Sequence, residues 1–269
     1  MSDFINQICI LGAGKVAKSL AIQFKKANLA IEIYSRTVTV ELENWASKNK
    51  IGLKTVFKTI NLKADLYLIC VSDSAIAIIA ENLQKLNYNN QAIIAHTAGG
   101  QNTLMLSKFS QNYGIFYPLQ SFSEGRELDF SQIPFCINGA NQLIINKLVN
   151  LAGKIAKADN VKVIDDQQRS KLHLAAVFVN NFNNFLLSCA QQYCESEQVD
   201  FNLLLPLMLE TSLKIKDNPL NISELQTGAA RRGDYNTINK HLELLENHPS
   251  WLKIYQLLTA EIINFYQKK

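Results

Sequence analysis

Hydrophobic and polar positions follow two different patterns along the chain. In the first part, short apolar runs rich in β-branched residues predict strands, and amphipathic segments between them predict helices. Strands are expected at residues 8–11, 30–34, 53–56, 64–71, 91–95, 114–117, 134–137 and 161–164. Helices are expected at residues 15–26, 40–50, 75–86 and 141–152. This alternation predicts an α/β fold with a doubly wound, mostly parallel sheet.

From about residue 166 onward the strand pattern is lost and long helical segments follow. The segment 167–195 is long and strongly apolar, which predicts one long central helix buried in an all-α C-terminal domain. Helices are also expected at 199–215, with a kink at Pro206, and from 249 to near 267. We therefore expect two domains, residues 1–165 and residues 166–269.

A glycine-rich turn joins the first predicted strand to the first predicted helix. Gly12 permits a sharp turn, Gly14 allows the backbone to approach a pyrophosphate, and Ala17 lets helix and strand pack closely. The N–H groups at the helix start would face the phosphates. A bare structural turn is the alternative, but the strand–turn–helix context favours a Rossmann-type dinucleotide-binding domain. The predicted cofactor contacts here are Gly12, Ala13, Gly14, Lys15 and Val16.

The second predicted strand ends in Ser35, Arg36 and Thr37. An NAD-specific fold usually has Asp or Glu at this point, which accepts hydrogen bonds from the ribose 2′-hydroxyl. An arginine beside hydroxyl groups suits a 2′-phosphate instead. A solvated strand end is the alternative. These three residues favour NADP over NAD as the cofactor.

Polar residues also follow two later strands. Val71, Ser72 and Asp73 would lie at the carboxyl end of a central strand, where open α/β sheets bind ligands, although helix capping explains Ser72 and Asp73 equally well. His96 and Thr97 begin a small-residue loop where a nicotinamide ring or substrate would come close. His96 is a candidate catalytic residue, and the alternative is a histidine that only hydrogen-bonds the loop backbone.

Polar residues form a stripe on the apolar helix 167–195. At about 100° per residue, the members of this stripe are Arg169, His173, Asn180, Asn184 and Gln191. An unpaired buried amide costs on the order of 1–3 kcal/mol, so the stripe faces either a wet cleft against the first domain, which we favour, or another helix. Since histidine titrates near neutral pH, His173 is the candidate proton donor. Asn180 and Asn184 would orient a carbonyl or imine.

A glycine-flanked turn near the C-terminus carries Arg231, Arg232 and Asp234. The arginines could bind a substrate carboxylate or phosphate in a bidentate manner, or they could equally be solvated. Asp234 is a natural N-cap for a helix expected at 236–246. Arg232 and Asp234 are the candidate substrate residues.

Composition narrows the function classes. The net charge of +4 is modest and its basic residues are scattered, which argues against a nucleic-acid partner. No apolar run approaches the length of a membrane span, and the N-terminus does not resemble a signal peptide. The five cysteines include no C-x-x-C pair, which indicates reduced thiols, no metal site and a cytoplasmic protein.

Five stretches carry a family resemblance that spans nearly the whole chain. They are Gly12 to Ala17, His96 to Gly99, Tyr117 to Ser123, Lys171 to Ala176 with Asn180, and Thr227 to Asp234. The chain resembles the 6-phosphogluconate dehydrogenase-like superfamily, which includes pyrroline-5-carboxylate reductase. More closely, it resembles a bacterial group of NADP oxidoreductases that pair a Rossmann-like domain with a helical domain of unestablished function. The resemblance implies an NADP-dependent enzyme and a homodimer formed through the helical domain.

The sequence departs from this superfamily at one position. β-Hydroxyacid dehydrogenases carry a catalytic lysine with an asparagine four residues later, whereas Lys171 is followed at that spacing by Ala175. The stripe offers His173 with Asn180 instead. Two functions therefore stay open. The first is an oxidoreductase that moves hydride between the nicotinamide and a small carbonyl, hydroxy-acid or imine substrate. The second is a non-catalytic NADP-binding sensor or partner-binding module.

Overall fold

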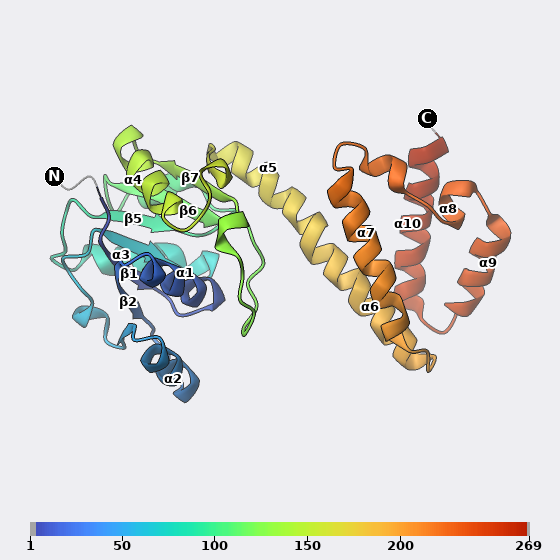
Figure 1. Ribbon diagram of the computed structural model, residues 1–269, viewed down its shortest axis with the longest axis horizontal. Coiled ribbons are helices and arrows are strands. Elements are labelled where there is room, and N and C mark those ends of the chain that lie inside the picture. The colour runs from blue at the N-terminus through green and yellow to red at the C-terminus, as the bar shows by residue number, and fades with distance from the viewer. Residues whose placement is uncertain (1–3, 268–269) are drawn as a thin grey trace. The chain divides into compact units, whose positions relative to one another are not determined.

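The computed structural model describes residues 4–267 (Figure 1). It forms two compact units, of which the first ends at Asn180 and the second begins at Asn181. The first unit contains the sheet together with the start of the long helix. The second unit is helical. The first unit extends beyond the predicted boundary at residue 165 because side chains at the start of the long helix bond to a loop of the sheet domain.

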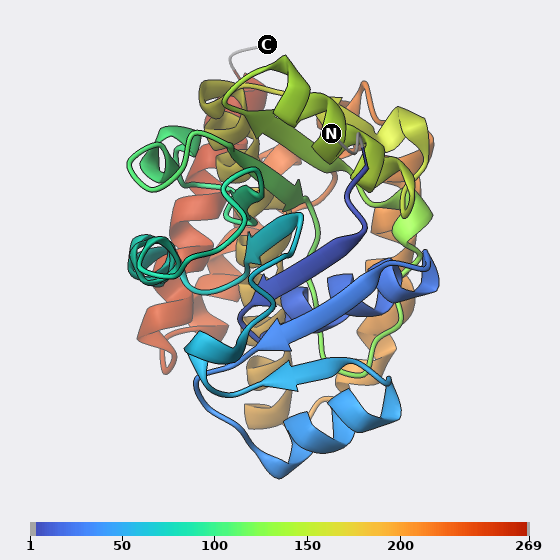
Figure 2. The same cartoon turned by 90° about the vertical axis from the view of Figure 1, so that its left-hand side faces the viewer.

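The first unit is built on one eight-stranded sheet with the strand order β3-β2-β1-β4-β5-β6-β7-β8 (Figure 2). The strands are β1 Gln7–Leu11, β2 Ala30–Tyr34, β3 Gly52–Lys54, β4 Leu66–Ile69, β5 Ile93–His96, β6 Tyr113–Pro118, β7 Phe135–Gly139 and β8 Val161–Val163. All neighbouring strands are parallel except β6 and β7. The predicted doubly wound, mostly parallel sheet is confirmed.

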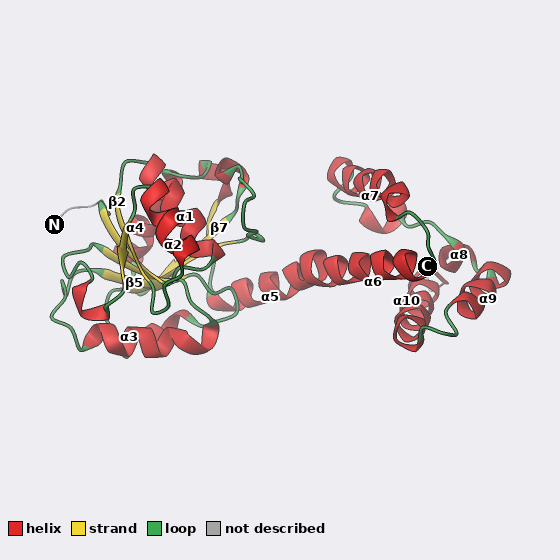
Figure 3. Ribbon diagram, turned by 90° about the horizontal axis from the view of Figure 1, so that it is seen from below, coloured by secondary structure: helices red, strands yellow, loops and turns green. Residues whose placement is uncertain are grey.

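Helices cover both faces of this sheet (Figure 3). They are α1 Lys15–Lys26, α2 Val40–Lys48, α3 Ile76–Gln84 and α4 Gln142–Gly153. The strand β1 alternates between two hydrophobic clusters, as the pleat requires. Ile8 and Ile10 pack in the cluster that includes α1 and α4, whereas Cys9 and Leu11 pack in the cluster that includes α3. Because β1 is buried on both faces, its carboxyl end and the glycine turn are held rigidly.

The second unit contains α6 Asn183–Ser196, α7 Leu205–Asp217, α8 Ala229–Arg232, α9 Tyr235–Leu244 and α10 Pro249–Gln267. The predicted kink at Pro206 is wrong. Pro206 lies in the first turn of α7, after a short 3₁₀ turn at Phe201–Leu204. Proline is tolerated in a first turn because its missing N–H would have no partner within the helix.

The long helix is not one regular α-helix. A π-helical segment, Val177–Phe182, separates α5 (Asp166–Ala176) from α6. A π-helix has a wider turn, so the uniform spacing on which the predicted polar stripe depends does not hold across it. The helix is also not buried as predicted, since Leu174 is 60% exposed and Phe185 is 56% exposed.

Within residues 4–267, no helix combines the length and the apolar character that a membrane span needs.

Candidate functional site

The glycine turn has the geometry of a phosphate cradle. Gly12 has a φ of +124°, and a Cβ placed there would lie 2.3 Å from the carbonyl oxygen of Cys70. Gly14 is the N-cap of α1 and supplies no side chain to its first turn, which also contains no acidic residue. The N–H groups of that turn are therefore available to an anion. These residues fit the pyrophosphate of a dinucleotide.

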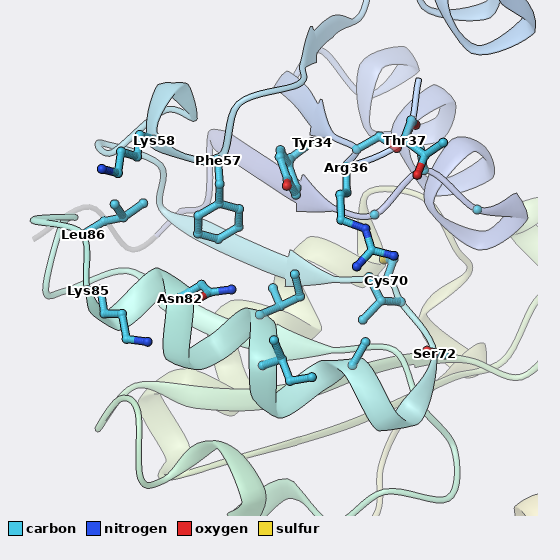
Figure 4. Close-up of a pocket in the computed structure, with 18 residues that line it drawn as sticks. Tyr34, Arg36, Thr37, Phe57, Lys58, Cys70, Ser72, Asn82, Lys85 and Leu86 are labelled. Atoms are coloured by element: carbon cyan, nitrogen blue, oxygen red, sulfur yellow. Dashed lines mark hydrogen bonds between the residues drawn. The ribbon is translucent and has the colours of Figure 1, made fainter. Parts of the chain in front are cut away.

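A cavity of about 990 Å³ opens beside this turn (Figure 4). It is lined by the turn, the end of β2, the end of β4 and one face of α3. In Figure 4 the guanidinium of Arg36 extends from the end of β2 into the cavity. The cavity contains eight of the predicted cofactor residues: Gly12, Ala13, Gly14, Ser35, Arg36, Thr37, Val71 and Ser72. Its described lining includes three basic side chains and no carboxylate, so its charge suits an anionic ligand.

A second cavity of about 420 Å³ adjoins the first, since both are lined by Gly14, Cys70 and Val71. The other predicted cofactor residues line it: Lys15, Val16, Asp73 and Thr97. Ala98, Gly99, Gln120 and Phe122 complete its wall. All twelve predicted contacts thus lie in two connected spaces on the carboxyl edge of the sheet. Gln120 and Phe122 are not among the predicted site residues, although both lie in a stretch that carries the family resemblance.

Ser72 and Asp73 do not cap a helix through their side chains, although the sequence allowed that interpretation. A 3₁₀ turn, Asp73–Ala75, precedes α3, and its N-cap Ser72 makes no capping hydrogen bond. The Asp73 carboxylate instead accepts a hydrogen bond of 2.9 Å from Nε2 of Gln101. Asp73 therefore ties the end of β4 to the loop after β5.

His96 is the last residue of β5 and is fully buried. Its Nδ1 accepts a hydrogen bond of 3.2 Å from the backbone N–H of Ala98, and its Nε2 has no hydrogen-bond partner among the described residues. Burial, together with the positive charge of Arg169, lowers the pKa of His96 to about 4. The imidazole is therefore neutral at physiological pH. It lines neither cavity, and its contact is the one expected of a histidine that supports the loop backbone.

Arg169 is completely buried in the first unit. Its Nε donates to the carbonyl of Gly99 at 3.0 Å, its Nη2 donates to the carbonyl of Gln101, and its Nη1 lies 2.6 Å from Oδ1 of Asp166. The placement of Arg169 in a wet polar stripe is therefore wrong. Its positive charge is neutralised by Asp166 and its donors are used to fix the loop after β5.

The Asp166 carboxylate extends this network. It accepts from the backbone N–H of Thr103 at 2.9 Å and from the Thr103 hydroxyl. Burial raises the pKa of Asp166, but the hydrogen bonds from Thr103 and Arg169 outweigh burial and hold the pKa below its usual value. Asp166 is thus an anion at neutral pH, as the buried guanidinium requires.

His173 lies one helical turn after Arg169 and faces the same loop. Its Nδ1 is 3.2 Å from the hydroxyl of Tyr117 on β6. A Cβ at Gly99 would lie 2.6 Å from this Nδ1 and 2.6 Å from Cζ of Tyr117, so only glycine fits between the two rings. Burial raises the pKa of Tyr117, so its hydroxyl stays protonated. Tyr117 lies in one of the stretches that carry the family resemblance, but its pairing with His173 was not predicted.

The other candidate residues follow later in the chain. Asn180 belongs to the π-helical segment and Asn184 to α6, and both are exposed. In the second unit, Nη1 of Arg231 donates to the carbonyls of Ser223, Glu224 and Gln226. Arg231 therefore stabilises the loop that precedes α8.

Asp234 caps α9 as the sequence predicted. Its carboxylate accepts from the backbone N–H of Thr237 at 3.1 Å and from the Thr237 hydroxyl at 2.7 Å. Arg232 is exposed. No group of three or more metal-ligating side chains occurs within residues 4–267.

Comparisons with known proteins agree with this geometry. Residues 7–99 match the family model described as NADP oxidoreductase coenzyme F420-dependent, and residues 133–262 match a domain of unknown function, DUF2520. The chain is 32% identical to a "putative NADP oxidoreductase" from Bacteroides fragilis whose crystal structure is known. The two align over 97% of this chain and 99% of that one, with a TM-score of 0.89. The chain belongs to this family of NADP oxidoreductases.

More distant structures share the fold. An imine reductase from Myxococcus stipitatus, solved in complex with NAD⁺, is 12% identical and has a TM-score of 0.64, with 96% of this chain and 93% of that chain covered. A 1-pyrroline-5-carboxylate reductase from Streptococcus pyogenes is 13% identical and has a TM-score of 0.63, with 98% and 100% covered. No curated protein sequence matches the chain. The protein is thus an oxidoreductase of the NAD(P)-dependent reductase family.

Proposed function

We propose that the protein uses NADP to move hydride between the nicotinamide and a small carbonyl, hydroxy-acid or imine substrate. The observation that carries the choice of NADP is the position of Arg36. Its guanidinium enters the larger cavity at the end of β2, beside Ser35 and Thr37, and no carboxylate lines that cavity among the described residues. A 2′-phosphate there would meet the bidentate guanidinium and the Thr37 hydroxyl, while the Ser35 hydroxyl donates to the carbonyl of Thr37 at 2.6 Å and so holds this turn.

In this proposal the two cavities bind different parts of the cofactor and the substrate. The nicotinamide supplies the hydride chemistry. The glycine turn and α1 hold the pyrophosphate, and Arg36 holds the phosphate on the ribose. The smaller cavity, between Thr97 and Phe122, is the space for the reacting ring and the substrate.

His173 is the proton donor in this proposal: its side chain lines neither cavity, but it lies beside Gly99, which lines the smaller cavity. The Tyr117 hydroxyl holds Nδ1 of the ring, which leaves Nε2 as the nitrogen that exchanges a proton with the substrate oxygen or nitrogen. Nε2 also lies near the loop residues Gly99 and Gly100, since a Cβ at Gly100 would be 3.8 Å from it. Asn180 is the candidate for orienting the substrate. The role predicted for Asn184, in the second unit, stays a prediction from sequence.

A homodimer formed through the second unit is part of the proposal. Among the described residues of that unit, only Cys194 and Ile238 are buried hydrophobic residues, while many large apolar side chains are exposed. Apolar surface of this extent marks an interaction site, and a second copy of the same chain is the simplest partner. All five cysteines are free, which supports a cytoplasmic location.

The first test is a titration of the protein with NADPH and with NADH, followed by calorimetry, for wild type and Arg36→Ala. Loss of a charged bidentate contact should weaken NADPH binding about ten- to hundredfold and leave NADH binding nearly unchanged. The matched control is Arg126→Ala, which removes an exposed arginine outside the larger cavity. Equal affinities of the wild type for both nucleotides would contradict the choice of NADP.

Catalysis is tested with a panel of small ketones, 2-oxo acids and cyclic imines, by following NADPH consumption. His173→Ala should retain NADPH binding and lose turnover of whichever substrate the wild type accepts. Unchanged turnover in this variant would remove His173 from the mechanism.

A further inference from the structure

The far end of the larger cavity has a composition that the phosphate contacts do not explain. The glycine turn and Arg36 account for the phosphates at one end. Beyond Arg36 the cavity continues along α3 as far as Lys85 and Leu86. If the proposed function holds, the pyrophosphate and the ribose occupy the first part, and the base of the nucleotide must extend into this far part.

One face of α3 forms an apolar floor in this part. Ile78 and Ile79 both line the cavity, and Ile78 is 59% exposed although it is a large hydrophobic residue. The aromatic ring of Phe57 contributes to the opposite wall and packs edge-on against Tyr34 at 4.9 Å. A flat heteroaromatic ring would cover the exposed surface of Ile78 and so remove apolar area from water.

Three polar side chains surround this floor, those of Lys58, Asn82 and Lys85, and they differ in their partners and in the direction in which they point. Nζ of Lys85 is 2.8 Å from Oε1 of Glu81, so its charge is already paired. In Figure 4 the ammonium of Lys58 points away from Arg36, whereas the amide of Asn82 points along the cavity toward Arg36. Asn82 is four residues after Ile78, which places both on the same face of α3.

We infer that Asn82 recognises the base of the cofactor and makes the protein selective for adenine. A carboxamide carries a donor and an acceptor side by side, and the edge of adenine presents an amino donor beside a ring-nitrogen acceptor. The carbonyl of Asn82 accepts from the 6-amino group and its NH₂ group donates to the neighbouring ring nitrogen. Asn82 makes no hydrogen bond with the other residues drawn in Figure 4, so the amide can turn to suit the base.

The test compares NADP with its 1,N⁶-etheno analogue, in which a two-carbon bridge blocks N1 and the 6-amino group but leaves every phosphate unchanged. Dissociation constants are measured by calorimetry for wild type, for Asn82→Ala and for the control Gln84→Ala. Gln84 is exposed on the same helix and does not line the cavity. Because Asn82 is exposed, its replacement should leave the melting temperature unchanged.

Wild type and Gln84→Ala should bind NADP about tenfold more tightly than the etheno analogue, which corresponds to one or two hydrogen bonds. Asn82→Ala should bind both ligands with similar affinity, near that of the wild type for the analogue. If the wild type binds both ligands equally, or if Asn82→Ala keeps the full preference for NADP, the base is not recognised by Asn82. In that case tight NADP binding would still support the proposed cofactor. If no variant binds NADP, the proposed function and this inference both fall.

Discussion

At the scale of single residues, Gly99 has no Cβ, and this absence lets the rings of Tyr117 and His173 approach each other. The two rings that flank it come from Tyr117 and His173, which are 56 positions apart in the sequence. The small-residue loop that begins at His96 and Thr97 was predicted to be open to a ligand, but no local pattern predicts which side chains fill the space beside it. A methyl group at Gly99 would overlap both rings. Glycine is therefore needed here for side-chain packing as well as for its backbone.

The buried His96 should also make the stability of the protein depend on pH. Its pKa is about 4 in the folded chain and 6.5 in the unfolded chain. As pH falls from 6.5 to 4, the unfolded chain binds a proton at this residue that the folded chain does not bind. The free energy of unfolding therefore decreases across this window, by about 3 kcal/mol in all.

Urea unfolding at pH 7 and pH 4 measures this loss. The change should be smaller by about 3 kcal/mol in His96→Asn, because asparagine can still accept from the Ala98 N–H but cannot become charged. Trp251→Phe in both proteins leaves Trp45, in α2, as the reporter of the first unit. An identical pH dependence in the two proteins would show that His96 does not titrate as inferred.

At the scale of elements, the attachment of α5 to the sheet domain depends on Arg169. The predicted helix was correct in position, but its periodicity suggested that Arg169 faces water. Burial of a guanidinium is tolerated because Asp166 and two loop carbonyls satisfy its donors. These bonds fix α5 to the loop after β5, and so they fix the position of His173, which lies on α5.

Arg169→Leu should lower the free energy of unfolding of the first unit by about 3–5 kcal/mol, because it leaves the Asp166 carboxylate without its counter-charge and two carbonyl groups without their donor. Lys171→Leu, an exposed position on the same helix, should change it by less than about 0.5 kcal/mol. Urea unfolding followed by Trp45 fluorescence in the Trp251→Phe background checks both values. A loss below about 1 kcal/mol for Arg169→Leu would mean that the ion pair is not needed to hold α5.

At the scale of the whole molecule, the second unit leaves many of its large aliphatic side chains exposed. On α7, Leu207 is 63% exposed and Leu209 is 61% exposed, and on α10 Leu257 is 63% exposed. Domains of this size normally bury their large aliphatic side chains. The proposed homodimer would cover them.

Light scattering should therefore give about twice the chain mass of 30.3 kDa. The double variant Leu207→Glu/Leu209→Glu should reduce the mass to that of one chain or cause aggregation, since it places two charges in the proposed interface. Lys216→Glu, an exposed polar position on the same helix, should leave the dimer intact. A monodisperse monomer in the wild type would contradict the proposed association.

The order of elements in the first unit, and several residues that line its larger cavity, follow from the sequence alone. β2 and α1 have the predicted bounds, and Gly12, Gly14 and Arg36 lie in the predicted cavity. These features could be predicted because they are local. A strand, a turn and a helix that follow one another directly are fixed by hydrophobic periodicity and by the conformational freedom of glycine.

Only the tertiary structure decided which distant residues meet. The burial of Arg169 and the pairing of Tyr117 with His173 arise from contacts between elements far apart in the chain. Apolar periodicity shows that a helix face is covered, but it does not show whether this chain or a second copy covers it. For that reason the helix 167–195 was predicted to be buried, whereas much of its apolar surface is exposed in the single chain.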